Sequence, residues 1–192
     1  YNWCDENGYK FTGHYIEEIT LAGQMCCCGG IMPFYEYEHI PGIDWLQRIV
    51  RNENSPKQVG SVAAQLGKKQ VLSETFALTG HNVSHGELKR IYEWQMVRGI
   101  TLLCQHLEGH SLRGLRKRDY PPTLNYQQPW WNDYRVFNDT VSRTGKLLSE
   151  GIMPFRKTPA NVLIRKGGTP KNVRKPTYHQ RRKDNARRHI KK

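Results

Sequence analysis

Short apolar segments alternate with clearly bounded helices along the first 150 residues, and this alternation limits the fold most strongly. Segments with the composition of strands lie at 9–16, 31–37, 70–74 and 100–104. The last of them, ITLLC, is the most apolar run and suits a strand covered on both faces of a parallel sheet. A strand–helix–strand order implies right-handed crossovers. We therefore predict an α/β fold with about four β/α units, either part of a (β/α)8 TIM-like barrel or a small open sheet.

Capping residues and glycines predict where the helices begin and end. Two helices each start with a capping box and stop at a glycine: Ser55 with Gln58 to Gly67, and Ser84 with Glu87 to Gly99. A short helix is expected at 17–25, and a longer one follows a loop at 107–129. The longer helix carries apolar residues at helical spacing, namely Tyr134, Phe137, Val141 and Leu148.

The charge is distributed very unevenly along the chain. Residues 1–150 contain 16 basic and 16 acidic residues, whereas residues 151–192 contain 14 basic residues and one acidic residue. The net charge of +13 therefore belongs to the last 42 residues. We predict a folded domain at 1–150 and a disordered basic tail at 151–192, because such a composition cannot bury a core.

The cysteines and the apolar content exclude several classes of protein. Five cysteines, three of them consecutive at 26–28, do not form a disulfide framework or a paired zinc motif, which favours a reducing, cytoplasmic setting. No segment approaches the ~20 apolar residues of a membrane span. The sequence starts at Tyr1 rather than Met, which we interpret as a trimmed or truncated start that hides any signal peptide.

Carboxylates and imidazoles stand where the predicted strands end, and chemistry in parallel α/β folds gathers at those ends. The first predicted strand contains His14 and runs into Glu17 and Glu18. The other three end in Glu36 with Glu38, followed by Asp44, then in Glu74 and in His106. The loop that follows adds Arg113, Trp130 and Trp131. Paired carboxylates beside aromatic rings are typical of glycoside hydrolysis. Each residue also has a plain structural interpretation: a solvated acid, a hydrogen-bonded histidine, or a tryptophan that seats the next helix.

Three segments together carry a resemblance to a known family. They are GSVAAQLGKKQVLSETFALTG, HGELKRIYEWQMVRGITLLCQH and QPWWNDYRVFNDTVSRTGKLLSEG. Their ordered motifs resemble the alpha-L-rhamnosidase-type glycoside hydrolases and their uncharacterised bacterial relatives. YKFTGHYIEE and FYEYEHIPGIDWL also look like preceding barrel units, so the resemblance covers about residues 1–150.

The resemblance implies a carbohydrate substrate and assigns candidate roles. Glu74 in LSETF would be catalytic, with Glu36 as its partner carboxylate and Glu38 or Asp44 as rivals. The remaining candidates would bind the sugar: His14, Glu38, Asp44, His106, Arg113, Trp130 and Trp131. A calcium ion near the sugar is also implied. Relatives are much longer, so the chain would be a barrel fragment, inactive by itself.

The basic tail leaves two interpretations open. It could bind RNA or DNA through its charge, which makes a nucleic-acid-binding protein the alternative function. The pentapeptide GIMPF, however, occurs at both 30–34 and 151–155, where the family pattern stops. We interpret that repeat as favouring a frameshift or an assembly join near residue 151.

Overall fold

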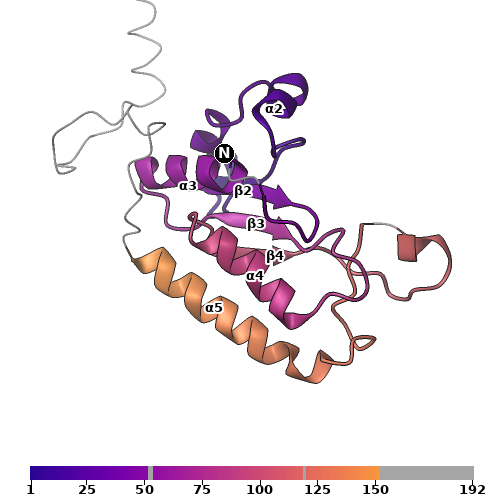
Figure 1. Ribbon diagram of the computed structural model, residues 1–192. Helices are drawn as coiled ribbons and strands as arrows, with labels where there is room; N and C mark the ends of the chain where they lie inside the picture. Colours follow the sequence, from indigo (N-terminus) through magenta and orange to yellow (C-terminus); the bar gives the residue numbers. More distant parts are fainter. Residues whose placement is uncertain (52–53, 119, 152–192) are drawn as a thin grey trace, which may run out of the picture. The chain divides into compact units, whose positions relative to one another are not determined.

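A computed structural model describes residues 1–151, apart from 52–53 and 119, and shows a mixed α/β fold around a four-stranded sheet (Figure 1). The strands follow the order of the chain: β1 (Thr12–Gly13), β2 (Ile40–Trp45), β3 (Leu72–Thr75) and β4 (Leu102–Gln105). All three neighbouring pairs are parallel. Their carboxyl ends therefore lie at one edge of the sheet. The parallel α/β prediction is confirmed, whereas a closed barrel is not confirmed.

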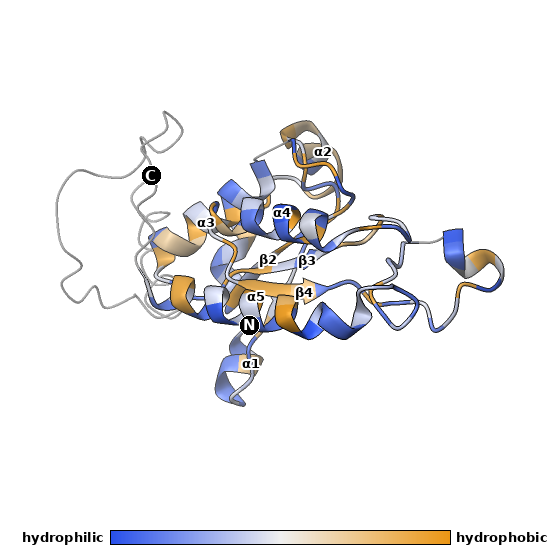
Figure 2. Cartoon of the chain, turned by 60° about the horizontal axis from the view of Figure 1, so that its bottom comes forward, coloured by the Kyte–Doolittle hydropathy of each residue, from blue (hydrophilic) through white to orange (hydrophobic). Residues whose placement is uncertain are grey.

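The helices lie between and after the strands. They are α1 (Asn2–Glu6), α2 (Leu21–Cys27), α3 (Asn54–Leu66), α4 (His85–Met96) and α5 (Tyr134–Glu150), with short 3-10 helices η1 (Phe34–Tyr37), η2 (Gly114–Arg118) and η3 (Trp131–Asp133). In Figure 1, α4 and α5 run side by side next to the strands. Figure 2 shows hydrophobic and hydrophilic residues alternating along α5, as expected for a helix with one packed side.

Alternate residues of each strand face the helices. Ile43 and Trp45 of β2 are buried in two apolar clusters that include residues of α3, α4 and α5. Ser73 and Thr75 of β3 both hydrogen-bond to Gln95 of α4. Because side chains alternate along a strand, the residues between them point to the opposite face. These residues are Gly42, Asp44, Leu72, Glu74, Leu102 and Cys104.

Two glycines allow the helices to approach the neighbouring backbone closely. A Cβ atom on Gly60 of α3 would lie 2.3 Å from the carbonyl oxygen of Arg98. A Cβ atom on Gly145 of α5 would lie 2.2 Å from the carbonyl oxygen of Thr101, which directly precedes β4. Any larger residue at either position would push the helix away from its support.

The predicted strands at the start of the chain are wrong in extent or in place. The segment 31–37 is a turn followed by η1, and the second strand is Ile40–Trp45 instead. Pro41 is tolerated there because the β2–β3 pairing begins one residue later, at Gly42, so no ladder hydrogen bond is lost. The first strand shrinks from 9–16 to Thr12–Gly13. The strands predicted at 70–74 and 100–104 are confirmed with a shift of one or two residues.

The four predicted helices are present as α2 to α5, whereas α1 at Asn2–Glu6 was not predicted. The capping box of Ser84 and Glu87 is present in both directions. Ser55 instead lies inside α3, where its hydroxyl donates to the carbonyl oxygen of Glu18, and Gln58 hydrogen-bonds to Gln24. The helix expected at 17–25 is α2, which is capped by Thr20.

The basic tail, the second GIMPF and the predicted nucleic-acid binding lie outside the described residues. Within the described part of the chain, no helix has the length and apolar character needed to cross a membrane.

Candidate functional site

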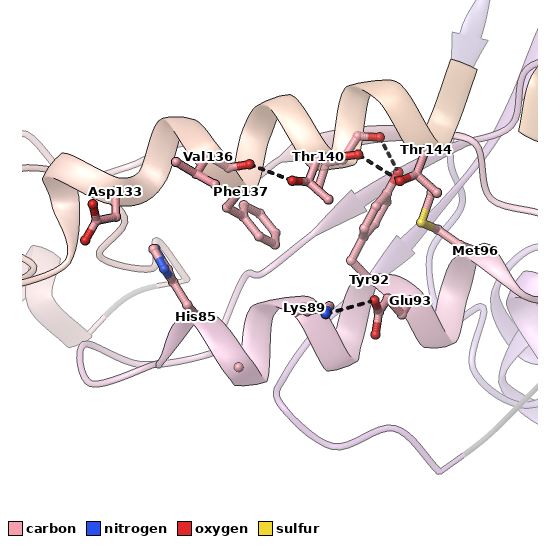
Figure 3. A pocket seen from close by; sticks show the side chains of 12 residues that line it. His85, Lys89, Tyr92, Glu93, Met96, Asp133, Val136, Phe137, Thr140 and Thr144 are labelled. Atoms are coloured by element: carbon pink, nitrogen blue, oxygen red, sulfur yellow. Dashed lines mark hydrogen bonds and ion pairs between the residues drawn. The ribbon is translucent and has the colours of Figure 1, made fainter. Parts of the chain in front are cut away.

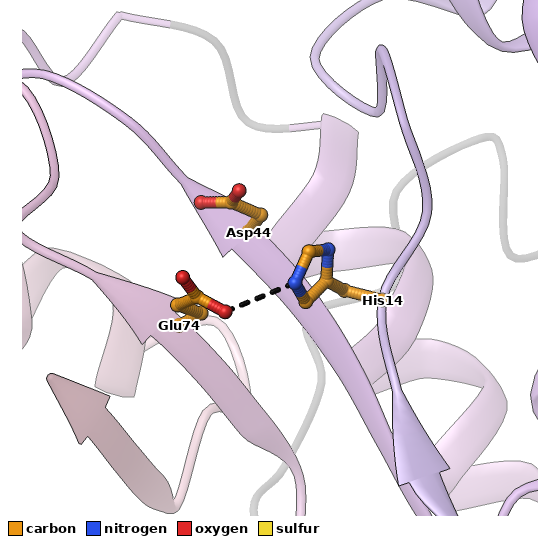
Figure 4. Close-up of side chains that lie close together, drawn as sticks. All are labelled: His14, Asp44 and Glu74. Atoms are coloured by element: carbon orange, nitrogen blue, oxygen red, sulfur yellow. Dashed lines mark hydrogen bonds and ion pairs between the residues drawn. The ribbon is translucent and has the colours of Figure 1, made fainter. Parts of the chain in front are cut away.

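His14, Asp44 and Glu74 come together at the carboxyl edge of the sheet (Figure 4). Asp44 and Glu74 are paired in register on β2 and β3, and both point away from the helices. His14 follows directly after β1 and reaches across to them. One nitrogen or oxygen atom from each of the three side chains lies within 4.8 Å of the others. The structure therefore brings together three of the residues predicted from the sequence, although His14 and Glu74 are 60 residues apart in the chain.

Glu74 is the centre of this cluster. Its Oε2 lies 3.0 Å from Nε2 of His14, and its Oε1 lies 3.8 Å from Nε2 of His106. His106 follows β4, and its Nδ1 lies 2.8 Å from the carbonyl oxygen of Leu107. Two imidazoles thus face the two oxygens of one carboxylate, an arrangement suited to moving or stabilising a proton.

Asp44 has the more secluded carboxylate. Its Oδ1 is buried and makes no hydrogen bond to any described residue. Burial raises the pKa of Asp44, and the neighbouring Glu74 raises it further, while His14 and His106 act in the opposite direction. Two adjacent carboxylates in such different surroundings are expected to divide the roles of proton donor and anion.

Unusual backbone conformations cluster at the same edge of the sheet. Among the described residues, the non-glycine residues with positive φ all follow a strand: Glu17 after β1, Gln47 after β2, and Phe76 and Leu78 after β3. Phe76 combines a φ of 77° with complete burial, two residues after Glu74. Backbone strain of this kind is found preferentially at functional sites.

Two further glutamates are buried beside the cluster. Glu18 is 3% exposed, and its carboxylate accepts hydrogen bonds from the backbone N–H groups of Tyr15 and Asp44. Glu38 is 2% exposed and accepts from the Tyr15 hydroxyl and the Gly42 N–H. Burial raises the pKa of Glu18 to about 8 and also raises the pKa of Glu38. Their oxygens are engaged by the chain itself, so Glu38 does not present a free carboxylate to a sugar.

The structure does not bring Glu36 to Glu74. Glu36 is an exposed residue of η1, four residues before β2 begins. Lys68, which lies four residues before β3, donates a hydrogen bond to its carbonyl oxygen. Glu36 therefore stands near the amino ends of the strands, whereas Glu74 stands at the carboxyl ends. The expectation that Glu36 ends a strand is wrong because the strand begins after it, and Asp44 occupies the position next to Glu74.

The other predicted sugar-binding residues lie in the loop and helix start after β4. Trp130 is half-buried: its Nε1 donates to the carbonyl oxygen of Val83, and its ring lies 4.4 Å from that of His85. Trp131 is 43% exposed. Arg113 is exposed in the loop, where its backbone N–H donates to Ser111. Trp130 thus has a packing role in seating α5, while Trp131 and Arg113 keep their side chains accessible.

A groove of about 460 Å³ lies between α4 and α5 (Figure 3). It runs past Tyr92, Met96 and Phe137, and its edge carries an ion pair of 3.5 Å between Lys89 and Glu93. These helices pack on the face of the sheet that Ser73 and Thr75 point to. The groove is therefore on the other side from Glu74 and contains no converging catalytic groups, so we do not take it as the active site.

The cluster does not match the calcium ion implied by the family resemblance. Calcium takes six to eight oxygen ligands. His14, Asp44 and Glu74 supply one imidazole and two carboxylates, and the imidazole is already hydrogen-bonded to Glu74. This mixed nitrogen and oxygen set suits other divalent metals better than calcium.

Sequence patterns left Tyr15 and Cys104 unnoticed. Tyr15 bridges the two buried glutamates, and Cys104 lies beside Glu74 in register on β4. Cys104 could have been found from alternation alone, because it stands on the same face of β4 as Leu102. Tyr15 carries no such signal, since its contacts depend on how the loop after β1 folds back.

Comparison with known proteins gives one relative. The chain is 26% identical over 184 residues to a protein of Formosa agariphila named "Putative beta-glucuronidase", and the match covers 88% of this chain but 14% of that protein. The chain thus spans about a seventh of the relative's length. No protein-family model matches the chain, and no solved structure matches it significantly. Because the identity is 26% and the match covers 14% of that protein, the comparison does not show a family for this chain, and it does not show a rhamnosidase.

Proposed function

We propose that this chain is part of a glycoside hydrolase in which Glu74, Asp44 and His14 act on an O-glycosidic bond. The observation that carries the proposal is the position of Glu74, which contacts His14 at 3.0 Å and pairs in register with Asp44. The similarity to a protein named as a glucuronidase supports the same reaction class. The sheet would be part of a larger (β/α)8 barrel, since all four strands are parallel and the cluster faces away from the helices.

The surroundings of the two carboxylates support a division of roles. Glu74, held between two imidazoles, acts as the anionic nucleophile. Asp44, whose pKa is raised by burial, protonates the leaving oxygen. Oxygens of the two groups lie within 4.8 Å, whereas inverting enzymes separate their carboxyl groups by roughly 6.5–9.5 Å to admit a water molecule. We therefore propose retention of anomeric configuration.

Two sugars are the first substrates to test. The family resemblance points to α-L-rhamnosides, and the name of the Formosa protein points to β-glucuronides. Aryl glycosides of both sugars, assayed side by side with the intact homologous enzyme, decide between them. The anomer released first, read by proton NMR, checks the proposed retention.

Substitution of the central carboxylate tests the reaction itself. In an intact homologous enzyme, the change equivalent to Glu74→Gln is expected to lower kcat by ~10²–10⁴, as loss of an acid/base group does. Asp44→Asn should cause a loss on the same scale, while Glu36→Gln serves as the matched control and should stay near the wild-type rate. A wild-type kcat for Glu74→Gln would remove this residue from the mechanism.

A further inference from the structure

One edge of β2 loses its strand partner just before the candidate site. The pairing of β1 with β2 ends at Gly13, opposite Pro41. The N–H groups of Gly42 and Asp44 point toward this edge, because alternate residues of a parallel strand hydrogen-bond to the same side. Without acceptors, these N–H groups would be buried and unsatisfied, which is costly.

Two glutamate side chains take the place of the missing strand. Oε2 of Glu38 accepts the Gly42 N–H at 3.1 Å, and Oε2 of Glu18 accepts the Asp44 N–H at 3.3 Å. Both side chains are almost completely buried. Each carboxylate therefore does for β2 what a backbone carbonyl of a longer β1 would do.

Tyr15 joins these two carboxylates to each other. Its backbone N–H donates to Oε1 of Glu18, and its hydroxyl donates to Oε1 of Glu38. Tyr15 directly follows His14, whose ring contacts Glu74. The path of the chain at His14 is thus fixed by side-chain contacts rather than by the sheet.

The loop is also anchored from behind. The carbonyl oxygen of Glu18 accepts hydrogen bonds from Nε2 of Gln24 at 2.7 Å and from the hydroxyl of Ser55 at 2.9 Å. These donors belong to α2 and α3. Glu18 therefore links α2 and α3, through its carbonyl oxygen, to the backbone N–H of Asp44 in β2, through its side chain.

We propose that Glu18, Glu38 and Tyr15 form a clasp that replaces a strand along the open edge of β2 and positions His14 against Glu74. All three are positioning residues, since none of them touches Glu74. The consequence for catalysis rests on the proposed function, whereas the clasp itself can be tested without any enzyme activity.

Amide hydrogen exchange in the full chain tests the clasp residue by residue. Glu18→Ala is expected to speed exchange at Asp44 and Tyr15 at least tenfold and to leave Gly42 protected. Glu38→Ala should speed exchange at Gly42 and leave Asp44 protected. Glu17→Ala, which removes an exposed neighbouring carboxylate, is the matched control and should change none of the three. Equal exchange rates at Asp44 in the Glu18 and Glu17 variants would overturn the proposal.

If an alanine variant does not fold, exchange in the wild-type protein and the milder variant Tyr15→Phe still test the clasp. In the wild type, the amides of Gly42 and Asp44 should be as protected as that of Ile43, whose N–H points to β3. Fast exchange at Gly42 and Asp44 would overturn the clasp. Tyr15→Phe removes one hydroxyl only, and it should weaken the nuclear Overhauser contact between the His14 ring and the Glu74 side chain. An unchanged contact would show that Tyr15 does not position His14.

An activity measurement then separates the clasp from the function. In an active homologue, the change equivalent to Tyr15→Phe should lower kcat several-fold with little change in KM, because the substrate contacts remain. If exchange confirms the clasp and no glycosidase activity is found, the proposed function fails and the clasp stands. If activity depends on Glu74 but Glu18→Ala leaves the amide exchange rate of Asp44 unchanged, the clasp is overturned and the proposed function is not.

Discussion

The β3–α4 region and the β1–β2 region reach the same sheet by different means. Between β3 and β4, backbone ladders run the full length of both strands, and α4 begins with a complete capping box. Between β1 and β2, the ladder covers two residue pairs, and the buried carboxylates of Glu38 and Glu18 accept the next two N–H groups of β2 on that side. Main-chain hydrogen bonds do not titrate, whereas carboxylates do. The edge of β2 nearest His14 therefore depends on the ionisation of Glu18 and Glu38. The β3–β4 ladder consists of main-chain hydrogen bonds, and the carboxylate of that region, Glu87, caps the start of α4.

The largest expected effect is on pH dependence in the β1–β2 region. Burial raises the pKa of Glu18 to about 8, from an ordinary 4.5, so the folded chain binds a proton that the unfolded chain has lost between these values. The free energy of unfolding should therefore fall as pH rises from 4.5 to 8, by on the order of 5 kcal/mol. Glu38 and Asp44, whose pKa values are also raised, add to the same trend. Urea unfolding at several pH values measures it.

The variant Glu18→Gln sharpens this prediction. It removes the ionisable group, so its stability should change less steeply between pH 5 and pH 8. Its stability should start below that of the wild type, because the amide NH2 cannot accept one of the two backbone N–H groups that the carboxyl group accepts. The groups facing Glu18 are otherwise unchanged, namely Tyr15, Tyr35, Glu38 and Asp44. Glu17→Gln should follow the wild-type profile throughout. A Glu18→Gln profile as steep as that of the wild type would show that Glu18 is not the titrating group.

The next largest effect concerns the contact of α5 with the start of β4. Gly145→Ala would place a Cβ atom 2.2 Å from the carbonyl oxygen of Thr101 and should destabilise the chain by about 1–3 kcal/mol. Gly86→Ala in α4 is the matched control: its Cβ would be 3.9 Å from the Ser84 hydroxyl oxygen, which is ordinary contact. That change should stabilise the chain by about 0.4–1 kcal/mol. Thermal unfolding of both variants gives the comparison, and equal effects would contradict the close approach.

The smallest effect concerns the start of α4. Ser84→Ala removes the cap and should cost about 1 kcal/mol. Hydrogen bonds from Arg48, followed by those from Ser84, lower the pKa of Glu87 from its ordinary 4.5 to about 2. The stability that Glu87 contributes is therefore present above pH 4.5 and is lost as pH falls toward 2, which is opposite in sign to the Glu18 effect.

Local hydrogen exchange distinguishes the two regions by this difference in sign. Acid should loosen the amides at the start of α4 first, and mild alkali should loosen those near Asp44 first. If both regions respond in the same direction, the opposite pH dependences assigned to Glu18 and Glu87 are wrong.

The candidate site was predictable in part. Glu74 lies in β3 and His106 directly follows β4, and the sequence places both strands to within two residues. The sequence predicts Asp44 as a sugar-binding residue and as a rival partner carboxylate, because placing the second strand at 31–37 leaves Ile40–Trp45 outside the predicted strands. Glu36 was preferred because an aromatic run at 31–37 has strand composition, although Pro33 takes a helical conformation there.

The sequence by itself determined the parallel α/β class, the capped helix α4 and the concentration of acids and imidazoles near strand ends. These properties depend on periodicity, apolar content and capping, which are local. Only the tertiary structure decided that Asp44 rather than Glu36 lies beside Glu74, and that Glu18 and Glu38 support β2 instead of facing a ligand. Those outcomes depend on strand register and on which backbone N–H groups lack a partner, and both are set by contacts between residues far apart in the chain.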